Sequence, residues 1–299
     1  MVFLSVKLDR VAVCVTFSNE NIAFFGATSN DEFTEEGITD GAAAILLLDV
    51  NPDFFTILFS EFPEKNYRET TRSIAVKALE KFLYPCFLIS GSNLETDAEE
   101  LLHGFEDIIG RNVNVFGGMA GDDKQFTEQF VFTNNNSSNR GVVALVMDED
   151  KLIVKGKSTC GWKPMGTEKT VTKSEGNKVY SIEGVSPLEL TQKYSGLENL
   201  TRENPTAGLE IGVSFPFQLQ REKGDPVMRP GLVLNWDVGS LICSGSLPQG
   251  SIIKFSLPPD FDVIEKVIAG CRELKEKKCR KQMLWFCSVV PADCYRWDR

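Results

Sequence analysis

Two acidic, glycine-containing segments hold the side chains of this chain that are best suited to bind a small charged molecule. Residues 116–123 read FGGMAGDD and residues 25–32 read FGATSNDE. Each begins with Phe-Gly, continues through small or apolar residues to a turn residue, and ends in two acids. Carboxylates bind amines through charge-assisted hydrogen bonds, and glycine lets a ligand approach the backbone closely. The repeated pattern predicts a site formed by two loops that face each other.

The acids of these segments have a second interpretation. Asp side chains often accept hydrogen bonds from backbone N–H groups of their own turn. Asp122 and Asp123 fit that structural role as well as they fit the lining of a pocket. In an extended backbone they would point to opposite faces, so they are not an obvious acid–base pair. The ligand-binding residues predicted from the two segments are Thr28, Ser29, Asp31, Gly117, Gly118, Asp122 and Asp123.

Three residues of the second half could complete such a site. Trp162 could form one wall of it, although a core or lid position is the alternative. Lys163 could neutralise a ligand carboxylate and Arg229 could clamp one, although a solvated lysine and a loop arginine are the alternatives. Because ligand sites favour domain junctions, we expect the pocket where loop 117–123, Trp162 and the second module meet.

Motifs of common catalytic sites are missing from the sequence. It contains no Gly-x-Ser-x-Gly elbow, Walker loop or His-Glu-x-x-His motif. A strand is expected after the glycines of 117–121, whereas a dinucleotide fingerprint needs a helix there. We therefore predict a binding protein and not an enzyme. A hydrolase-like enzyme that uses the acidic loops is the alternative.

The sequence predicts no bound cofactor. Its eight cysteines contain no Cys-x-x-Cys pair and its single histidine is His103, which favours reduced thiols over a zinc site or a disulfide framework. The neighbours of His103 are apolar and could surround a haem, so a haem site is the alternative.

Composition limits the classes of partner. The chain has 299 residues, of which 42% are hydrophobic and 25% are charged, as in a soluble globular protein. A net charge of −10 argues against nucleic acid, because binding phosphates needs clustered Lys and Arg. No apolar run reaches the ~18–20 residues of a membrane span, and charged residues interrupt the N-terminal stretch where a signal peptide would lie. We expect a cytoplasmic protein.

Short apolar runs alternate with helical patterns along the chain and would position these side chains. A capping box of Thr96 and Glu99 is expected to start the second helix, and 141–148 and 152–157 are expected to form a hairpin. Helices are predicted at 67–82, 96–109, 187–194 and 261–281. Strands are predicted at 11–17, 22–27, 43–50, 54–60, 86–90, 130–132, 141–148, 152–157, 170–173, 178–182, 211–215, 232–236, 241–244 and 252–256.

An internal duplication is expected in the first half. Each acidic segment is followed by a strand that begins with Gly and ends in Asp, at 41–49 after the first copy and at 141–148 after the second. The order of features matches as well as their composition, which favours a repeat. The fold class predicted is therefore α+β, with two mixed α/β modules, largely antiparallel sheets packed with helices, and an internal strand–loop–strand duplication.

The chain resembles the FIST domain family (F-box and intracellular signal transduction). The resemblance to its N-terminal module covers roughly residues 10–190, and 205–280 resemble its C-terminal module. It rests on FGGMAGDD at 116–123, the strand at 141–145, GWKPMG at 161–166, 171–180 and the loop 26–32, with Pro216, Arg229 and LPQG at 247–250 in the second module.

This resemblance implies a sensory module of signal transduction that binds a small ligand, most simply an amino acid. The partners implied are that small molecule and a histidine kinase or another signalling protein, with no nucleic acid and no membrane. A subset of the family resembles haem-binding nitric oxide sensors, which is the alternative function. We expect a FIST N-like module at 1–195 and a FIST C-like module at 196–299. The last helix and glycine-rich loop of the second module are expected to be absent.

Overall fold

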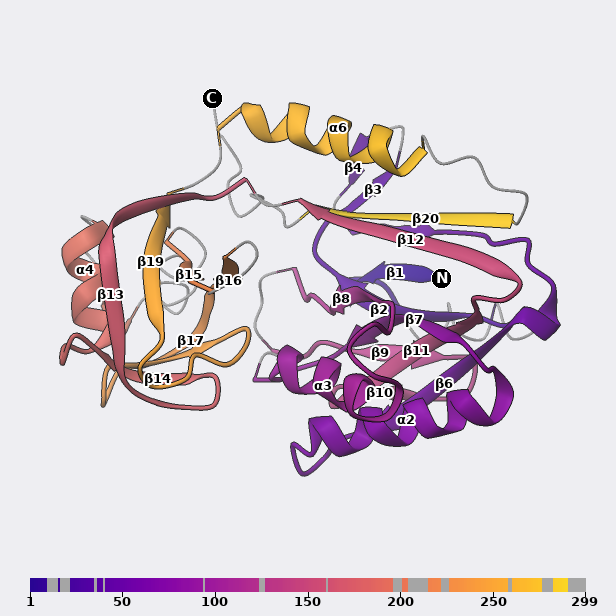
Figure 1. The fold of residues 1–299 in the computed structure, drawn as a ribbon, viewed down its shortest axis with the longest axis horizontal. Helices are drawn as coiled ribbons and strands as arrows, with labels where there is room; N and C mark the ends of the chain where they lie inside the picture. Colours follow the sequence, from indigo (N-terminus) through magenta and orange to yellow (C-terminus); the bar gives the residue numbers. More distant parts are fainter. Residues whose placement is uncertain are drawn as a thin grey trace. The chain divides into compact units, whose positions relative to one another are not determined.

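The computed structural model describes residues 1–9, 16, 22–34, 37–39, 41–93, 95–123, 127–159, 161–195, 201–203, 215–221, 226–257, 260–275 and 282–289 (Figure 1). It has the α+β architecture that the sequence predicts, with helices and mixed or antiparallel sheets. The chain divides into unit 1, Met1–Gly156 with Lys278–Phe286, and unit 2, Lys157–Lys277 with Cys287–Arg299. The boundary expected near residue 195 concerns family modules and stays a prediction.

A four-stranded sheet forms the centre of unit 1. Its strand order is β6-β11-β7-β8, in which β7 and β8 run parallel and the other neighbours run antiparallel. Helices α2 and α3 cover one face of this sheet (Figure 1). The bounds are Phe55–Glu61 for β6, Tyr67–Lys81 for α2, Pro85–Gly91 for β7, Ala98–Ile109 for α3, Val115–Met119 for β8 and Gly141–Asp148 for β11.

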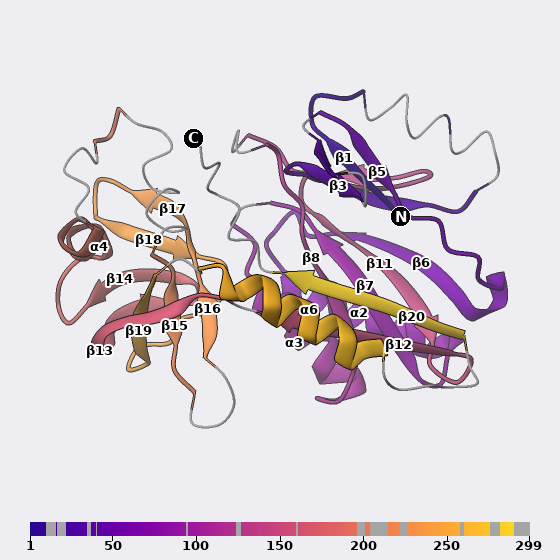
Figure 2. The same ribbon diagram turned by 90° about the horizontal axis from the view of Figure 1, so that it is seen from above.

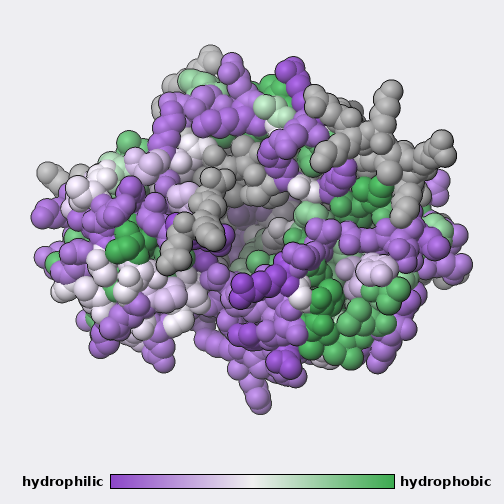
Figure 3. Space-filling view, in the orientation of Figure 1, coloured by the Kyte–Doolittle hydropathy of each residue, from purple (hydrophilic) through white to green (hydrophobic). Residues whose placement is uncertain are grey.

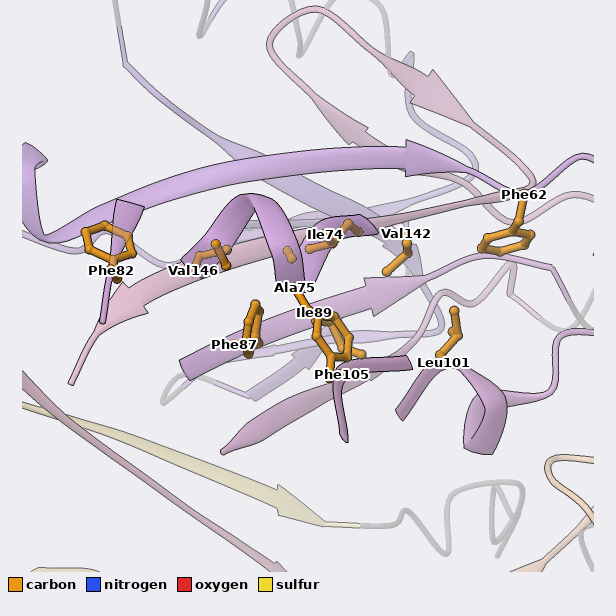
Figure 4. Close-up of a cluster of buried hydrophobic side chains, with 12 residues drawn as sticks. Phe62, Ile74, Ala75, Phe82, Phe87, Ile89, Leu101, Phe105, Val142 and Val146 are labelled. Carbon is orange, nitrogen blue, oxygen red and sulfur yellow. The ribbon is translucent and has the colours of Figure 1, made fainter. Parts of the chain in front are cut away.

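The core beneath the helices is aromatic and aliphatic (Figure 4). Phe87 of β7 and Phe105 of α3 are fully buried, with ring centroids 4.4 Å apart. Phe87 and Ile89 point to the helices, whereas Cys86 and Leu88 of the same strand belong to a second cluster on the other face. β7 is therefore buried on both faces, which explains its continuous apolar sequence.

A five-stranded sheet packs on that other face, so unit 1 has three layers (Figure 2). Its order is β10-β9-β2-β1-β5, and β1 and β2 run parallel. A short hairpin of β3 and β4 follows β2. The bounds are Val2–Ser5 for β1, Phe25–Ser29 for β2, Glu32–Thr34 for β3, Gly37–Thr39 for β4, Ala43–Ile45 for β5, Val131–Thr133 for β9 and Ser137–Ser138 for β10.

Strand pairing in the two sheets of unit 1 repeats, as the duplication predicts. β1 lies between β2, which is parallel to it, and β5, which is antiparallel. β7 likewise lies between β8, which is parallel to it, and β11, which is antiparallel. In both copies a hairpin follows the parallel strand along the chain, β3–β4 in the first and β9–β10 in the second. The acids of the two segments lie beyond the ends of equivalent strands, β2 and β8.

Unit 2 is built on a seven-stranded sheet in the order β16-β15-β19-β13-β14-β18-β17, with antiparallel pairing throughout. Its core includes Val171, Phe217 and Phe255. The strand bounds are Lys163–Glu175 for β13, Lys178–Ile182 for β14, Phe217–Leu219 for β15, Val227–Arg229 for β16, Gly231–Asn235 for β17, Ser240–Cys243 for β18 and Ile252–Leu257 for β19. The helix bounds are Pro187–Ser195 for α4 and Asp262–Lys275 for α6.

Two local predictions about pairing and capping are wrong. The hairpin expected from 141–148 and 152–157 does not form, because β11 is a central strand between β6 and β7, and β12 (Leu152–Thr159) pairs with β20 (Gln282–Val289). The N-cap of α3 is Asp97 and not Thr96: its carboxylate accepts from the Glu99 N–H at 3.0 Å. The Thr96 hydroxyl instead donates to the carbonyl oxygen of Ser92 at 2.8 Å.

Strand lengths also differ from the sequence pattern. Gly117 and Gly118 belong to β8 and not to a turn, because the strand continues to Met119. The run predicted as a strand over 43–50 is a strand only to Ile45, since β5 pairs with the short strand β1, which the pattern missed. The strand expected at 11–17, except Thr16, most of the strand at 211–215 and the end of the helix at 261–281 lie outside the described residues.

None of the helices in the part of the chain that the structure describes is long and apolar enough to cross a membrane.

Buried thiols give a prediction about cysteine chemistry. Burial raises the pKa of the Cys243 thiol to about 12, and burial together with nearby Glu149 also raises the pKa of Cys86. Only the thiolate reacts with iodoacetamide, so at about pH 8 both residues should be alkylated at least tenfold more slowly than the partly exposed Cys271. Peptide mass spectrometry of native protein measures the rates, and urea-unfolded protein is the control. Equal labelling of Cys243 and Cys271 in the native protein would contradict this assignment.

Candidate functional site

The two acidic segments meet at the carboxyl ends of the parallel strands of unit 1. The N–H group of Gly121 donates to the carbonyl oxygen of Thr28 at 2.8 Å, and the N–H group of Asp122 donates to Oδ1 of Asn30 at 3.0 Å. The predicted contact between the loops is therefore confirmed. Ligands of α/β proteins commonly bind outside the carboxyl ends of parallel strands, so this position suits a site.

The two adjacent aspartates of the second loop have different surroundings. Asp122 is 2% exposed, and its carboxylate accepts a hydrogen bond from the N–H group of Thr127 at 2.8 Å. Asp123 is half-buried and accepts from the Ser5 hydroxyl at 2.7 Å. Its backbone is in the left-handed region, with φ of 53°. Asp122 thus has the turn role that was one of the two interpretations, and Asp123 is the more accessible acid.

The first loop shows the same division between a buried and an accessible acid. Glu32 is buried, and its carboxylate accepts from the Ser29 hydroxyl at 2.7 Å and from the Ala42 N–H at 3.2 Å. Asp31 is exposed and also has a positive φ, of 44°. The Thr28 hydroxyl oxygen accepts from the N–H group of Phe130, the residue before β9, at 2.9 Å. Thr28 therefore holds the start of β9 against β2. Among the acids of segments 25–32 and 116–123, the accessible ones are therefore Asp31 and Asp123.

The glycine of each Phe-Gly pair has a structural task. A Cβ on Gly117 would lie 1.9 Å from the carbonyl oxygen of Ile89, its register partner in β7. A Cβ on Gly26 would lie 2.2 Å from the carbonyl oxygen of Val2, its register partner in β1. Both glycines therefore permit close pairing with the parallel central strand. Gly118 has open space where its Cβ would be, so its backbone is accessible to a ligand.

The three candidates of the second half lie in unit 2. Trp162 is 9% exposed, and its carbonyl oxygen accepts from the Gln218 side chain. The ammonium of Lys163 lies 2.5 Å from a carboxylate oxygen of Asp260, and this hydrogen bond raises the pKa of Lys163. Arg229 is buried, and its guanidinium donates to the carbonyl oxygen of Ser246 at 3.0 Å. These contacts stabilise unit 2, and a role of the three residues toward a ligand stays a prediction.

His103, the candidate haem ligand, lies on a polar part of α3. Its side chain is 38% exposed, and Nδ1 lies 3.1 Å from a carboxylate oxygen of Glu106. Its apolar neighbours Leu101 and Phe105 are buried in the core under the helices. Leu101 and Phe105 therefore face the core, whereas the His103 side chain does not lie among them.

Sequence reasoning missed Asn30, which joins the two loops, and Ser5, which joins β1 to the second loop. Asn30 stood in the repeated motif as a turn residue, and its side-chain amide could have been recognised as a bridge. Ser5 had no signal, because its strand is short and isolated in the sequence. Among the described residues of the site, the acids bond to hydroxyls and backbone N–H groups and no hydrogen bond joins two titratable side chains. The described residues also contain no group of three metal-ligating side chains. Chemically, the site can bind a cationic group.

Comparison with known proteins gives a family match. A family model described as the FIST N domain matches residues 2–185, which is more than half of the chain. The match includes both acidic segments of unit 1 and strands β13 and β14 of unit 2. No curated protein and no solved structure matches the chain.

Proposed function

The chain belongs to the FIST N domain family, a family of sensory domains of signal transduction, and we propose that it senses a small ligand carrying an amino group, a free amino acid, at the acidic loops of unit 1. The signal would pass to a histidine kinase or another signalling protein. Binding and not chemical conversion is proposed, in keeping with a family of sensory domains.

The observation that carries this proposal is the contact between the loops at the ends of β2 and β8. It brings the accessible carboxylates of Asp31 and Asp123 to one edge of unit 1, while their buried neighbours Glu32 and Asp122 hold the loops. A carboxylate can accept about four hydrogen bonds. Asp123 can therefore keep its bond from Ser5 and still accept from a ligand ammonium.

A zwitterion suits this edge better than a sugar or a nucleotide. Its ammonium would pair with Asp123 or Asp31 through charge-assisted bonds. Its carboxylate would accept from backbone N–H groups near the open Gly118, where no side chain blocks approach. Phosphate groups of a nucleotide would be repelled by the same acids.

Asp123→Ala should abolish ligand-induced stabilisation and leave the unliganded melting temperature nearly unchanged. A ligand at 100 times its Kd stabilises the native state by about 2.7 kcal/mol. A thermal-shift screen of the wild type against the common amino acids identifies the ligand, and the variant is then measured with that ligand. If no amino acid raises the wild-type melting temperature, the proposed ligand class is wrong.

Asp122→Ala provides the matched control. It removes the buried acceptor of the Thr127 N–H, so it should lower the free energy of unfolding by about 1–3 kcal/mol in the absence of ligand. Asp123→Ala should cost less than Asp122→Ala, because Asp123 is half-buried whereas Asp122 is 2% exposed. A large loss of stability in Asp123→Ala would assign both acids to turn structure.

A further inference from the structure

A hydrophobic cavity lies between the two sheets of unit 1, and its described lining contains none of the acids of the two loops. Its volume is about 120 Å³. The walls come from the N-terminal residues Met1 and Val2, residues 22–25 at the start of β2, the end of β5 with the segment that follows it to Val50, and side chains of β6 and β11, among them Phe55 and Met147. All lining side chains in the described part of the chain are apolar.

The segment 45–50 explains why the cavity reaches the surface. It continues the apolar run beyond the end of β5, and Leu46 and Leu47 are 43% and 75% exposed. In the duplicated copy, the equivalent run forms β11, which is paired on both sides and buried from Gly141 to Met147. The first copy thus leaves its apolar run over a void. In the orientation of Figure 3, hydrophobic residues gather on part of the visible surface of unit 1.

We propose that this cavity is a second binding site, for a small uncharged apolar molecule about the size of a benzene ring. An enclosed apolar protein cavity of about 150 Å³ binds benzene, and the void here, which reaches the surface, is close to that size. Phenylalanine rings and the Met147 thioether in the wall make favourable contacts with an aromatic ring. No charged side chain lines the cavity in the described part of the chain, and the Met1 ammonium donates to the carbonyl oxygen of Leu46 at 3.0 Å. A zwitterion such as the amino acid proposed for the loops would therefore lose its hydration without a partner for its own ammonium.

Methionine methyl groups provide site-specific reporters for toluene as the probe. In protein labelled with ¹³C-methyl methionine, toluene should shift the Met147 signal in a saturable way. Met165 and Met228 lie in unit 2 and outside the described lining, so their signals should stay in place. Met147→Leu assigns the reporter signal. Benzoate, the charged analogue, should shift none of the three. An unmoved Met147 signal, or equal non-saturating shifts of all three, would overturn the proposal.

Val50→Phe tests whether the void itself is the site. The added ring would occupy the cavity from a segment outside the sheets, so toluene should no longer shift Met147. Val76→Phe, on an exposed position of α2, is the matched control and should retain the full shift. An undiminished, saturable shift in a folded Val50→Phe protein would contradict the assignment. If Val50→Phe does not fold, the wild-type titration with toluene and benzoate decides the question.

Asp123→Ala separates this proposal from the proposed amino acid site. The toluene response of Met147 should persist in that variant, because Asp123 does not line the cavity. The Met147 response to toluene should also persist if the amino acid screen finds no ligand. One proposal can therefore be wrong while the other holds. Loss of the response in a folded Asp123→Ala protein would count against a separate apolar site.

Discussion

Gly117→Ala should lower the free energy of unfolding by about 2–5 kcal/mol, since it adds both steric overlap and backbone strain. The new Cβ would lie 1.9 Å from the carbonyl oxygen of Ile89, and a backbone atom of a paired strand cannot rotate away. The φ of Gly117 is 137°, a conformation that alanine rarely adopts. Urea unfolding followed by circular dichroism measures the loss.

Gly118→Ala is the matched control for that substitution. It changes the next residue of the same strand, and its Cβ would enter open space. Its stability should stay within about 0.5 kcal/mol of the wild type, as for ordinary surface substitutions. If the two alanine variants were equally stable, the close pairing of β8 with β7 would not explain the Phe-Gly motif.

Gly26 permits the same close strand pairing in the first copy of the repeat as Gly117 does in the second. Its Cβ would lie 2.2 Å from the carbonyl oxygen of Val2 in the parallel strand β1. Two glycines in equivalent registers against equivalent central strands support the duplication more firmly than the sequence pattern does. The motif therefore has a structural role. Gly117, which was predicted as a ligand-binding residue, is required for strand pairing, whereas Gly118 is not.

Local sequence patterns predicted most of the elements but not their partners. The periodicity of 67–82 and the cluster of apolar residues at 86–90 indicated α2 and β7 correctly, because each pattern is set by burial within one element. The hairpin of 141–148 with 152–157 was wrong because pairing is decided by residues far apart in sequence. β11 instead pairs with β6 and β7.

The candidate site was predictable only where its residues share a motif. The repeated acids indicated that loops 25–32 and 116–123 belong together, and the hydrogen bond from Asp122 to Asn30 joins them. Ser5 could not be found, because its role depends on β1 lying parallel to β2. The different exposures of Asp122 and Asp123 were likewise invisible in a sequence that gives two identical neighbouring acids.

Phe105→Ala should lower the free energy of unfolding by about 3–5 kcal/mol, because it removes a fully buried ring and leaves a cavity. The ring lies between α3 and β7 and contacts Phe87 at a centroid distance of 4.4 Å (Figure 4). Leu102→Ala, on the exposed side of the same helix, should change stability by less than about 1 kcal/mol. Urea unfolding of both variants compares the buried and exposed positions directly.

Hydrogen exchange then locates the damage in Phe105→Ala. The core cluster that holds Phe105 contains residues of α2, α3 and the four-stranded sheet, so exchange should accelerate most in peptides of these elements. Peptides of β13 and β19 belong to the separate core of unit 2 and should keep most of their protection. Equal acceleration in both units would mean that they unfold as one cooperative structure. A response confined to unit 1 would show that this core can open without the separate core of unit 2.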